Sequence, residues 1–327
     1  METALSNRFF IYVFIPFLAV LATGSFYIDF LKKRYLGQYI REDGPESHQS
    51  KAGTPTMGGV LIIGAFLLGV GAMAVLDDRL LTLETWVVLI VVLIFAALGF
   101  IDDYQKITKK KNKGLSGYSK LAIQLSTGVA VGLFLMNNYG IQGVDVFGQT
   151  YWQLGWLFPV FTMLVITGAS NAVNLTDGLD GLAAGCLAIS FIALAAMLYN
   201  AQQPELTILT LILAGACLGF LGFNKHPAQV FMGDTGSLAL GGALGVLGVL
   251  GGLPMWLLLI GGVYVLETLS VIIQVVSFKS TGKRVFRMAP LHHHFELGGM
   301  AETKVVRLFY GIQLVLALLA CGLFFLS

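Results

Sequence analysis

Long apolar stretches separated by short polar segments make up nearly the whole chain. A helix that crosses the hydrocarbon core of a bilayer needs about 20 mostly apolar residues. Ten stretches meet that length, at residues 9–31, 58–76, 84–101, 119–138, 157–175, 181–200, 206–223, 237–252, 254–277 and 305–326. Little polar sequence separates the eighth stretch from the ninth, near residues 251–254. The pattern predicts an all-α polytopic membrane protein with about ten transmembrane helices, formed by a single integral membrane domain over residues 1–327.

The composition supports this prediction. Of the 327 residues 56% are hydrophobic and only 12% are charged, whereas about a quarter are charged in soluble domains. The 40 glycines suit packed membrane helices, in which small residues let backbones approach closely. The first apolar stretch is too long for a signal-peptide core, so we expect a retained span. We expect no nucleic-acid partner.

Basic residues concentrate in alternate loops, and this sets the orientation. Cytoplasmic loops of membrane proteins carry an excess of Lys and Arg. With the N-terminus outside, all of the 20 Lys and Arg except Arg8 and Arg79 fall on the cytoplasmic side. An even number of spans then returns the C-terminus to the outside. We therefore expect the polar loops of the cytoplasmic face to form the active site, at about residues 32–57, 102–118, 176–180, 224–236 and 278–304.

The outer loops are plain by comparison. Residues 139–156 carry Tyr151, Trp152 and Trp156, and such aromatic residues are typical of the membrane–water interface. The polar residues that are hard to explain as solvated surface fall on the cytoplasmic loops or the adjoining helix ends.

Asp102 and Asp103 end the third predicted span, and Lys106 follows them. Adjacent carboxylates repel each other unless a cation neutralises the pair. Carboxylates at a helix C-terminus also oppose the helix dipole, so the position is unfavourable without a partner. The pair is therefore either a solvated helix end or part of a site that holds a cation.

A second polar run lies at the junction of the fifth and sixth predicted spans. Asn171, Asn174, Asp177 and Asp180 recur every third residue, and two glycines among them indicate that the chain turns here. Asp177 and Asp180 would then lie near a helix N-terminus, where carboxylates and bound anions are both favoured. The alternative is a tight turn between two helices.

A third run leads into the eighth predicted span. Gly233 and Gly236 flank Asp234, and Asn224 and Phe231 precede them. Glycine lets a ligand approach the backbone closely and exposes its N–H donors. Phe231 could stack on a nucleotide base or simply anchor the chain at the membrane interface.

His292, His293 and His294 are consecutive residues of the last cytoplasmic loop, close to Arg284 and Arg287. Adjacent histidines rarely converge on one ion and no cysteine lies in these loops, which argues against structural zinc. Contacts from the histidines to phosphate oxygens fit the neighbouring arginines better.

Taken together, these loops supply several carboxylates, lysines, histidines and glycine N–H groups. Carboxylate oxygens suit Mg²⁺, which binds one or two of them together with substrate phosphates. A metal that neutralises charge and cations that hold a diphosphate are the requirements of phosphoryl transfer. Because the scaffold is a membrane domain, one substrate is expected to be a lipid.

The chain resembles the phospho-N-acetylmuramoyl-pentapeptide transferase (MraY) family within the wider polyprenyl-phosphate N-acetylhexosamine-1-phosphate transferases. The resemblance rests on five motifs in the family order, at residues 51–59, 102–106, 171–181, 224–237 and 290–296. The ten-span topology with both termini outside is similar too.

The resemblance implies transfer of phospho-MurNAc-pentapeptide from UDP-MurNAc-pentapeptide to undecaprenyl phosphate, which gives lipid I and UMP. It implies Mg²⁺ as cofactor, a homodimer, and a location in the bacterial inner membrane with the active site on the cytoplasmic face. Asp234 and Asp103 would be metal ligands, and Asp102 would be the base that deprotonates the lipid phosphate. The catalytic set would be Asp102, Asp103, Lys106, Asp234, His292, His293 and His294. The uridine and diphosphate pocket would comprise Lys51, Thr56, Asn174, Asp177, Asp180, Asn224 and Phe231.

Two other functions compete with this one. A sister enzyme would transfer GlcNAc-1-phosphate to the same lipid with shared catalytic carboxylates, so the discrimination depends on the loop that carries the histidines. An ion-coupled transporter would need ionisable residues within its spans, and Glu267 is the one good candidate. A single midspan carboxylate against many polar groups on one face disfavours transport.

Overall fold

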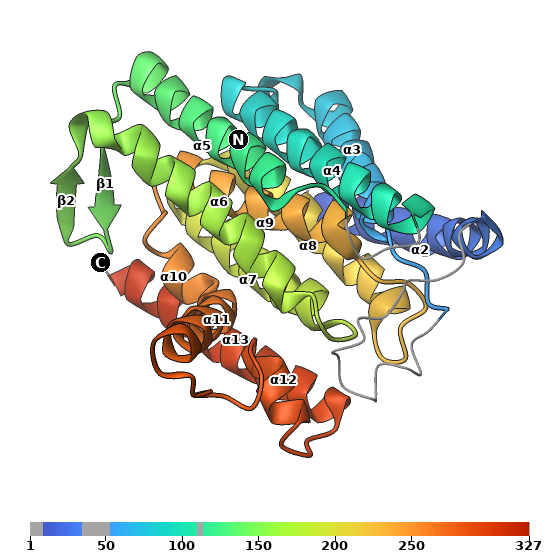
Figure 1. Cartoon of the computed structure of the whole chain (residues 1–327). Helices are drawn as coiled ribbons and strands as arrows, with labels where there is room; N and C mark the ends of the chain where they lie inside the picture. The colour runs from blue at the N-terminus through green and yellow to red at the C-terminus, as the bar shows by residue number, and fades with distance from the viewer. Residues whose placement is uncertain (1–8, 35–52, 110–113, 327) are drawn as a thin grey trace.

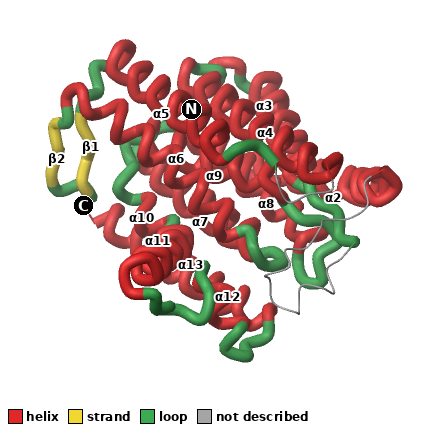
Figure 2. The backbone as a smooth tube through the Cα atoms, viewed as in Figure 1, coloured by secondary structure: helices red, strands yellow, loops and turns green. Residues whose placement is uncertain are grey.

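The computed structural model describes residues 9–34, 53–109 and 114–326, and it confirms the all-α membrane fold. Within those residues ten helices are long and apolar enough to cross a membrane. Most of them run side by side in one elongated bundle (Figure 1). Figure 2 shows how little of the described chain is strand.

The ten long helices follow the ten predicted spans. They are α2 (Phe9–Arg34), α3 (Gly59–Leu76), α4 (Leu83–Lys109), α5 (Gly117–Tyr139), α6 (Phe158–Thr176), α7 (Leu182–Asn200), α8 (Pro204–Asn224), α9 (Gly233–Leu250), α11 (Gly262–Thr281) and α13 (Glu302–Leu326). Four short helices lie between them: η2 (Asp78–Leu80), η3 (Gly155–Leu157), α10 (Leu257–Ile260) and α12 (Leu291–Glu296).

Helix α9 forms the centre of the bundle. It packs along α4 on one side and α6 on the other, and almost all of its residues are buried. Glycines make this close packing possible: a Cβ atom at Gly242 would lie 2.4 Å from the ring of Phe95 in α4. Small residues serve the same purpose in other packed membrane helices. The site described below lies at one end of this central helix.

Several helix boundaries differ from the sequence prediction. Helix α4 does not end at Asp102 but continues to Lys109, because Asp102 and Lys106 form an ion pair one helical turn apart, at 2.7 Å. Helix α9 begins at Gly233 rather than at residue 237, which places Asp234 in its first turn. The eighth and ninth spans are separate helices, as predicted, but the ninth begins at Gly262 rather than at residue 254, because the short helix α10 takes up the first part of the predicted span.

The loop at residues 139–156, which is predicted to lie outside, contains a structure that its aromatic composition did not predict. Strands β1 (Gly143–Val146) and β2 (Thr150–Gln153) form an antiparallel hairpin. Three residues, 147–149, connect the strands, and the first two of them, Phe147 and Gly148, both have positive φ angles. The ring of Phe147 packs edge-on against Trp256, with centroids 5.1 Å apart. The hairpin and the end of α13 lie at one end of the bundle, and α12 lies at the other (Figure 1).

Candidate active site

Three aspartates from two helices meet at the end of the bundle opposite the hairpin. Asp102 and Asp103 of α4 and Asp234 of α9 each offer an oxygen atom, and these atoms lie within 4.8 Å of one another. The helices approach closely here because Gly99 has no side chain: a Cβ atom there would lie 2.1 Å from the carbonyl oxygen of Asp234. Such a group of carboxylate oxygens could hold a metal ion.

Asp103 serves as the N-terminal cap of α9, although it belongs to another helix. Its Oδ2 atom accepts hydrogen bonds from the backbone N–H (2.9 Å) and the hydroxyl (2.7 Å) of Thr235, and its Oδ1 atom accepts one from the N–H of Asp234 (3.2 Å). The N-cap residue of α9, Met232, has no side-chain acceptor to offer. The first N–H groups of a helix need an acceptor, so Asp103 both satisfies them and fixes the position of Asp234.

Asp102 is fully buried and faces two lysines. Its Oδ2 atom lies 2.7 Å from the Nζ atom of Lys106, and its Oδ1 atom lies 3.4 Å from the Nζ atom of Lys120. The same Oδ1 atom accepts a hydrogen bond of 2.7 Å from the backbone N–H of Leu115, just before α5. Asp102 thus joins the end of α4 to the beginning of α5.

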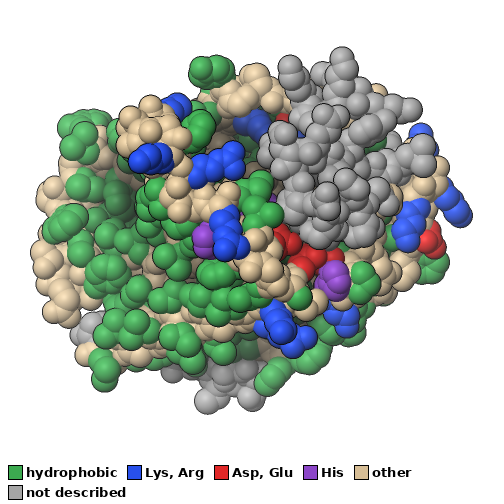
Figure 3. Space-filling view, turned by 60° about the horizontal axis from the view of Figure 1, so that its bottom comes forward, with side chains coloured by type: hydrophobic (Ala, Val, Ile, Leu, Met, Phe, Trp, Pro, Cys, Tyr) green, Lys and Arg blue, Asp and Glu red, His purple; other side chains and the backbone are tan. Residues whose placement is uncertain are grey.

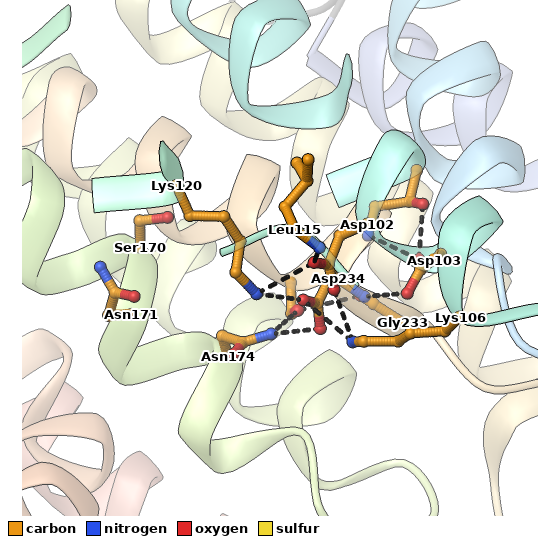
Figure 4. Close-up of polar contacts among 12 residues, drawn as sticks. Asp102, Asp103, Lys106, Leu115, Lys120, Ser170, Asn171, Asn174, Gly233 and Asp234 are labelled. Atoms are coloured by element: carbon orange, nitrogen blue, oxygen red, sulfur yellow. Dashed lines mark hydrogen bonds and ion pairs between the residues drawn. The ribbon is translucent and has the colours of Figure 1, made fainter. Parts of the chain in front are cut away.

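Asp234 is the most accessible carboxylate of the three, with 15% of its side chain exposed. Its Oδ2 atom lies 3.3 Å from Nζ of Lys106 and 3.1 Å from Nζ of Lys120. Its Oδ1 atom accepts a hydrogen bond of 3.0 Å from the side-chain amide of Asn174. Figure 4 shows the two ammonium groups on either side of this carboxylate. The lysines therefore offset much of the negative charge of the aspartate cluster.

The sequence prediction missed Lys120. It lies at the entry of the fourth predicted span, where it counted only toward the orientation of the chain. Its position in α5, with Asp102 and Asp234 as partners, depends on how three helices pack.

Asp177 and Asp180 lie in the turn between α6 and α7, as predicted, but they have different surroundings. Asp177 ends α6. Burial raises the pKa of its carboxyl group to about 7, and the charges of Asp234 and Asp103 act in the same direction. Asp177 is therefore near the aspartate cluster. The turn itself needs Gly181, whose φ angle is +80°.

Asp180 connects three segments of backbone. Its Oδ2 atom accepts a hydrogen bond from the N–H of Ala228 (3.1 Å) and lies 3.0 Å from Nδ1 of His226, while its own N–H donates to Glu302 in the first turn of α13. Asp180, His226 and Glu302 form the second group of possible metal ligands among the described residues.

Asn224 and Phe231 belong to the segment between α8 and α9. The side chain of Asn224 accepts from the N–H of Gly181 (3.1 Å) and donates to the carbonyl of Val230 (2.9 Å), so both of its polar ends are engaged with backbone. Phe231 is partly buried, and its N–H donates to the carbonyl of Pro55 at 2.8 Å.

Thr56 lies next to the first turn of α9. It is 4% exposed, and its hydroxyl oxygen lies 2.6 Å from the position that a Cβ atom on Gly233 would take. The hydroxyl has no hydrogen-bond partner among the described residues. Lys51 lies outside the described residues.

The three histidines of α12 point to different partners. His292 is buried and lies 3.1 Å from Glu267 of α11, His293 lies 2.9 Å from Glu296, and Nδ1 of His294 accepts from the N–H of Arg287 at 3.1 Å. His292 reaches the turn between α6 and α7, where its Nε2 atom lies against Gly178. Glu267 of α11, which the sequence had suggested for an ion-coupled transporter, is thus paired with the histidine loop.

Figure 3 shows this end of the bundle in space-filling form. Acidic side chains gather beside histidine and basic side chains, and apolar surface covers much of the rest of the face. A cluster of carboxylate and ammonium groups at the end of a membrane bundle is suited to bind a divalent cation and an anionic group together. Fold and site therefore define a polytopic membrane protein of the kind that transfers phosphorylated groups.

Comparison with known proteins identifies the family. The family model for glycosyl transferase family 4 matches residues 85–252, and signature 1 of phospho-N-acetylmuramoyl-pentapeptide-transferase matches residues 51–63. Proteins named phospho-N-acetylmuramoyl-pentapeptide-transferase from Oceanobacillus iheyensis and from Bacillus subtilis (strain 168) are each 46% identical to this chain, over 310 and 314 residues; each alignment covers 94% of this chain and 95% of the relative. The chain belongs to the phospho-N-acetylmuramoyl-pentapeptide-transferase family, which confirms the resemblance found in the motifs.

Proposed function

We propose that this protein transfers phospho-MurNAc-pentapeptide from UDP-MurNAc-pentapeptide to undecaprenyl phosphate, forming lipid I and releasing UMP. The observation that carries this proposal is the cluster of Asp102, Asp103 and Asp234 with Lys106 and Lys120 at one end of a ten-helix membrane bundle. Family membership supports the identity of the transferred group. We place the reaction at the cytoplasmic face of the bacterial inner membrane. The site lies at the helix ends that the basic loops connect, and basic loops are typical of the cytoplasmic side.

The reaction needs an attacking phosphate and a diphosphate held in line. An oxygen of the lipid phosphate attacks the β-phosphorus of the UDP-sugar, the bond to the bridging oxygen breaks, and UMP leaves with that oxygen. Lys106 and Lys120 are 29% and 26% exposed, so their ammonium groups can exchange Asp234 for phosphate oxygens. Two cations in contact with the diphosphate stabilise the charge that develops on the leaving UMP.

The site residues fit Mg²⁺ as cofactor. The donors are carboxylate oxygens, which this ion prefers, and Mg²⁺ typically uses one or two of them together with substrate phosphates. Asp234 is the best-placed ligand because its carboxylate is partly exposed, whereas the oxygens of Asp103 already accept three hydrogen bonds. Once bound, Mg²⁺ would neutralise charge on the transferred phosphate. We assign Asp234 as the main ligand and Asp103 as the residue that holds it in place.

The remaining predicted residues form the rest of the proposed substrate pocket. The buried hydroxyl of Thr56 is available as a donor beside Gly233, and Asn174 reaches Asp234 directly. Asp177 is close enough to Asp234 and Asp103 to interact with their charges, and its neighbour Gly178 packs against His292. Asp180 and Asn224 hold the backbone of the pocket through their hydrogen bonds, and Phe231 would stack on uracil. Lys51 belongs to the same proposal, as does a homodimer, which rests on the family resemblance alone.

Release of UMP tests the proposal. Purified protein supplied with UDP-MurNAc-pentapeptide, undecaprenyl phosphate and Mg²⁺ should release UMP, and it should release far less with UDP-GlcNAc in place of the peptide-bearing substrate. Asp234→Asn keeps the size of the side chain but removes its charge, so turnover should fall by orders of magnitude while the protein remains folded. A variant within about tenfold of wild type, or about 1.4 kcal/mol of barrier, would show that Asp234 is not an essential ligand. Preference for UDP-GlcNAc would instead identify the sister transferase.

A further inference from the structure

Glu267 is a carboxylate buried inside the bundle, and it has no role in the reaction proposed above. It lies in the second turn of α11 and is 0% exposed. An ionisable side chain within a membrane span is costly to bury and is usually paired with another group. The identity of its partner therefore indicates what it does.

That partner is His292. The Oε1 atom of Glu267 lies 3.1 Å from Nδ1 of His292 and 3.3 Å from its backbone nitrogen. A carboxylate oxygen accepts hydrogen bonds, so the proton of the imidazole on this side is on Nδ1. One oxygen of α11 thus fixes both the beginning of α12 and the orientation of the His292 ring.

The other end of the ring is directed at the proposed pocket. A Cβ atom on Gly178 would lie 2.3 Å from Nε2 of His292, so this nitrogen packs directly against the turn that carries Asp177. His292 is 1% exposed, and its Nε2 atom has no hydrogen-bond partner among the described residues. Buried polar atoms nearly always have a partner, and a substrate group could supply this one.

The neighbouring histidines lack this arrangement. His293 is paired with Glu296 of its own short helix, and Nδ1 of His294 accepts from the backbone of Arg287. His292 alone among the three is held by a carboxylate of a membrane span. A carboxylate that orients a histidine in this way is a recurring device in active sites, where it selects the ring tautomer and the direction of the free nitrogen.

We propose that Glu267 is a positioning residue for the transfer reaction: it holds the His292 ring with Nδ1–H bonded, so that Nε2 is presented to substrate at the Asp177–Gly178 turn. This inference rests on the proposed function. Glu267 acts through His292 and has no contact with substrate of its own.

A double-mutant cycle tests the proposal, because a residue that acts only through another shows no effect once that other residue is removed. UMP release from UDP-MurNAc-pentapeptide is measured for wild type, Glu267→Ala, His292→Ala and the double variant, with the thermal midpoint of each as a check of folding. Glu267→Ala should lower kcat/KM by roughly 10–100-fold, the range for loss of a carboxylate that orients a histidine ligand. In the His292→Ala background the same change should have an effect of less than about twofold.

Two further variants separate positioning from simple packing. Glu267→Gln keeps a carbonyl oxygen that can accept from both N–H groups of His292, so it should recover most of the activity lost in Glu267→Ala. Ser270→Ala removes a buried hydroxyl on the next turn of α11, which donates to the backbone carbonyl of Glu267 but does not touch its carboxylate, and it should retain wild-type activity.

Equal losses from Glu267→Ala in both backgrounds, or no recovery in Glu267→Gln, would overturn the positioning role. A wild-type protein that releases no UMP would contradict the proposed function instead. The two failures are therefore distinguishable.

Discussion

The three aspartates of the cluster have the same chemistry but different partners. Asp103 caps a helix, Asp102 pairs with lysines, and Asp234 keeps part of its carboxylate accessible. Identical side chains within a few ångströms of one another thus have different roles, because each has different neighbours. The same principle separates the three histidines of α12.

The partners of Asp102 predict its role in the reaction. Its oxygens are engaged by Lys106, Lys120 and the N–H of Leu115, so we expect it to orient the lysines rather than to remove a proton from the lipid phosphate. Asp102→Asn should lower kcat without changing the shape of its pH profile at saturating Mg²⁺. A general base would matter most at acidic pH, where the lipid phosphate holds a proton. A loss that grows as the pH falls would therefore restore the base role.

Asp177 should reduce the stability of the protein at neutral pH when metal and substrate are absent. Its pKa is about 7 in the folded protein, against an ordinary value of 3.8, so between these values the folded state holds a proton that the unfolded state has lost. Stability therefore falls as the pH rises from about 4 to 7, by at most about 4 kcal/mol. Asp177→Asn should raise the thermal midpoint more at pH 8 than at pH 4. An equal change in the thermal midpoint at both pH values would mean that burial does not disfavour the charged form of Asp177.

The sequence could identify nearly all of these residues but not their partners. Motif spacing located Asp102, Asp234 and His292, because polar groups beside apolar spans are conspicuous. Lys120 and Glu267 acquire their significance only from contacts between distant helices. Such contacts depend on how the helices pack, and hydropathy carries no information about that.

At the scale of elements, hydropathy located every long helix and misplaced some of their ends. A hydrophobic stretch ends where charges begin, but α4 continues for two further turns because its charges are paired within the protein. The β-hairpin was missed for another reason: its connection begins with Phe147, which is not a typical turn residue, and contact with Trp256 holds Phe147 in place.

The contact between α4 and α9 should depend on Gly99. Any side chain there would meet the backbone of Asp234 and Thr235, and overpacking of this kind typically costs about 1–3 kcal/mol. Gly99→Ala should lower the thermal midpoint and reduce UMP release more than tenfold, because it separates Asp103 from the first turn of α9. Gly64→Ala on α3 is the matched control, since a Cβ atom there meets nothing within 4 Å. If both variants behave like wild type, the close approach of the two helices is not needed.

At the scale of the whole molecule, the number of spans was predictable, and the orientation stays a prediction that labelling can test. In a variant without its three native cysteines, Gln149→Cys should react with an impermeant maleimide added to intact cells. Lys283→Cys should react only after the membrane is opened, because it belongs to a basic loop. Both positions are exposed, so failure to react cannot be attributed to burial. The reverse pattern would invert the molecule and place the site on the other face.

The cap that Asp103 supplies to α9 also has a consequence for biosynthesis. The two partners are 131 residues apart in sequence. Helix α9 is the fifth long helix after α4, so it can contact α4 only after all five have been synthesised. During that interval Asp102 has a partner in its own helix, Lys106, whereas the partners of Asp103 have not yet been made. Asp103 thus lacks these helix partners until the eighth span has been inserted, and the proposed catalytic centre forms only with that insertion.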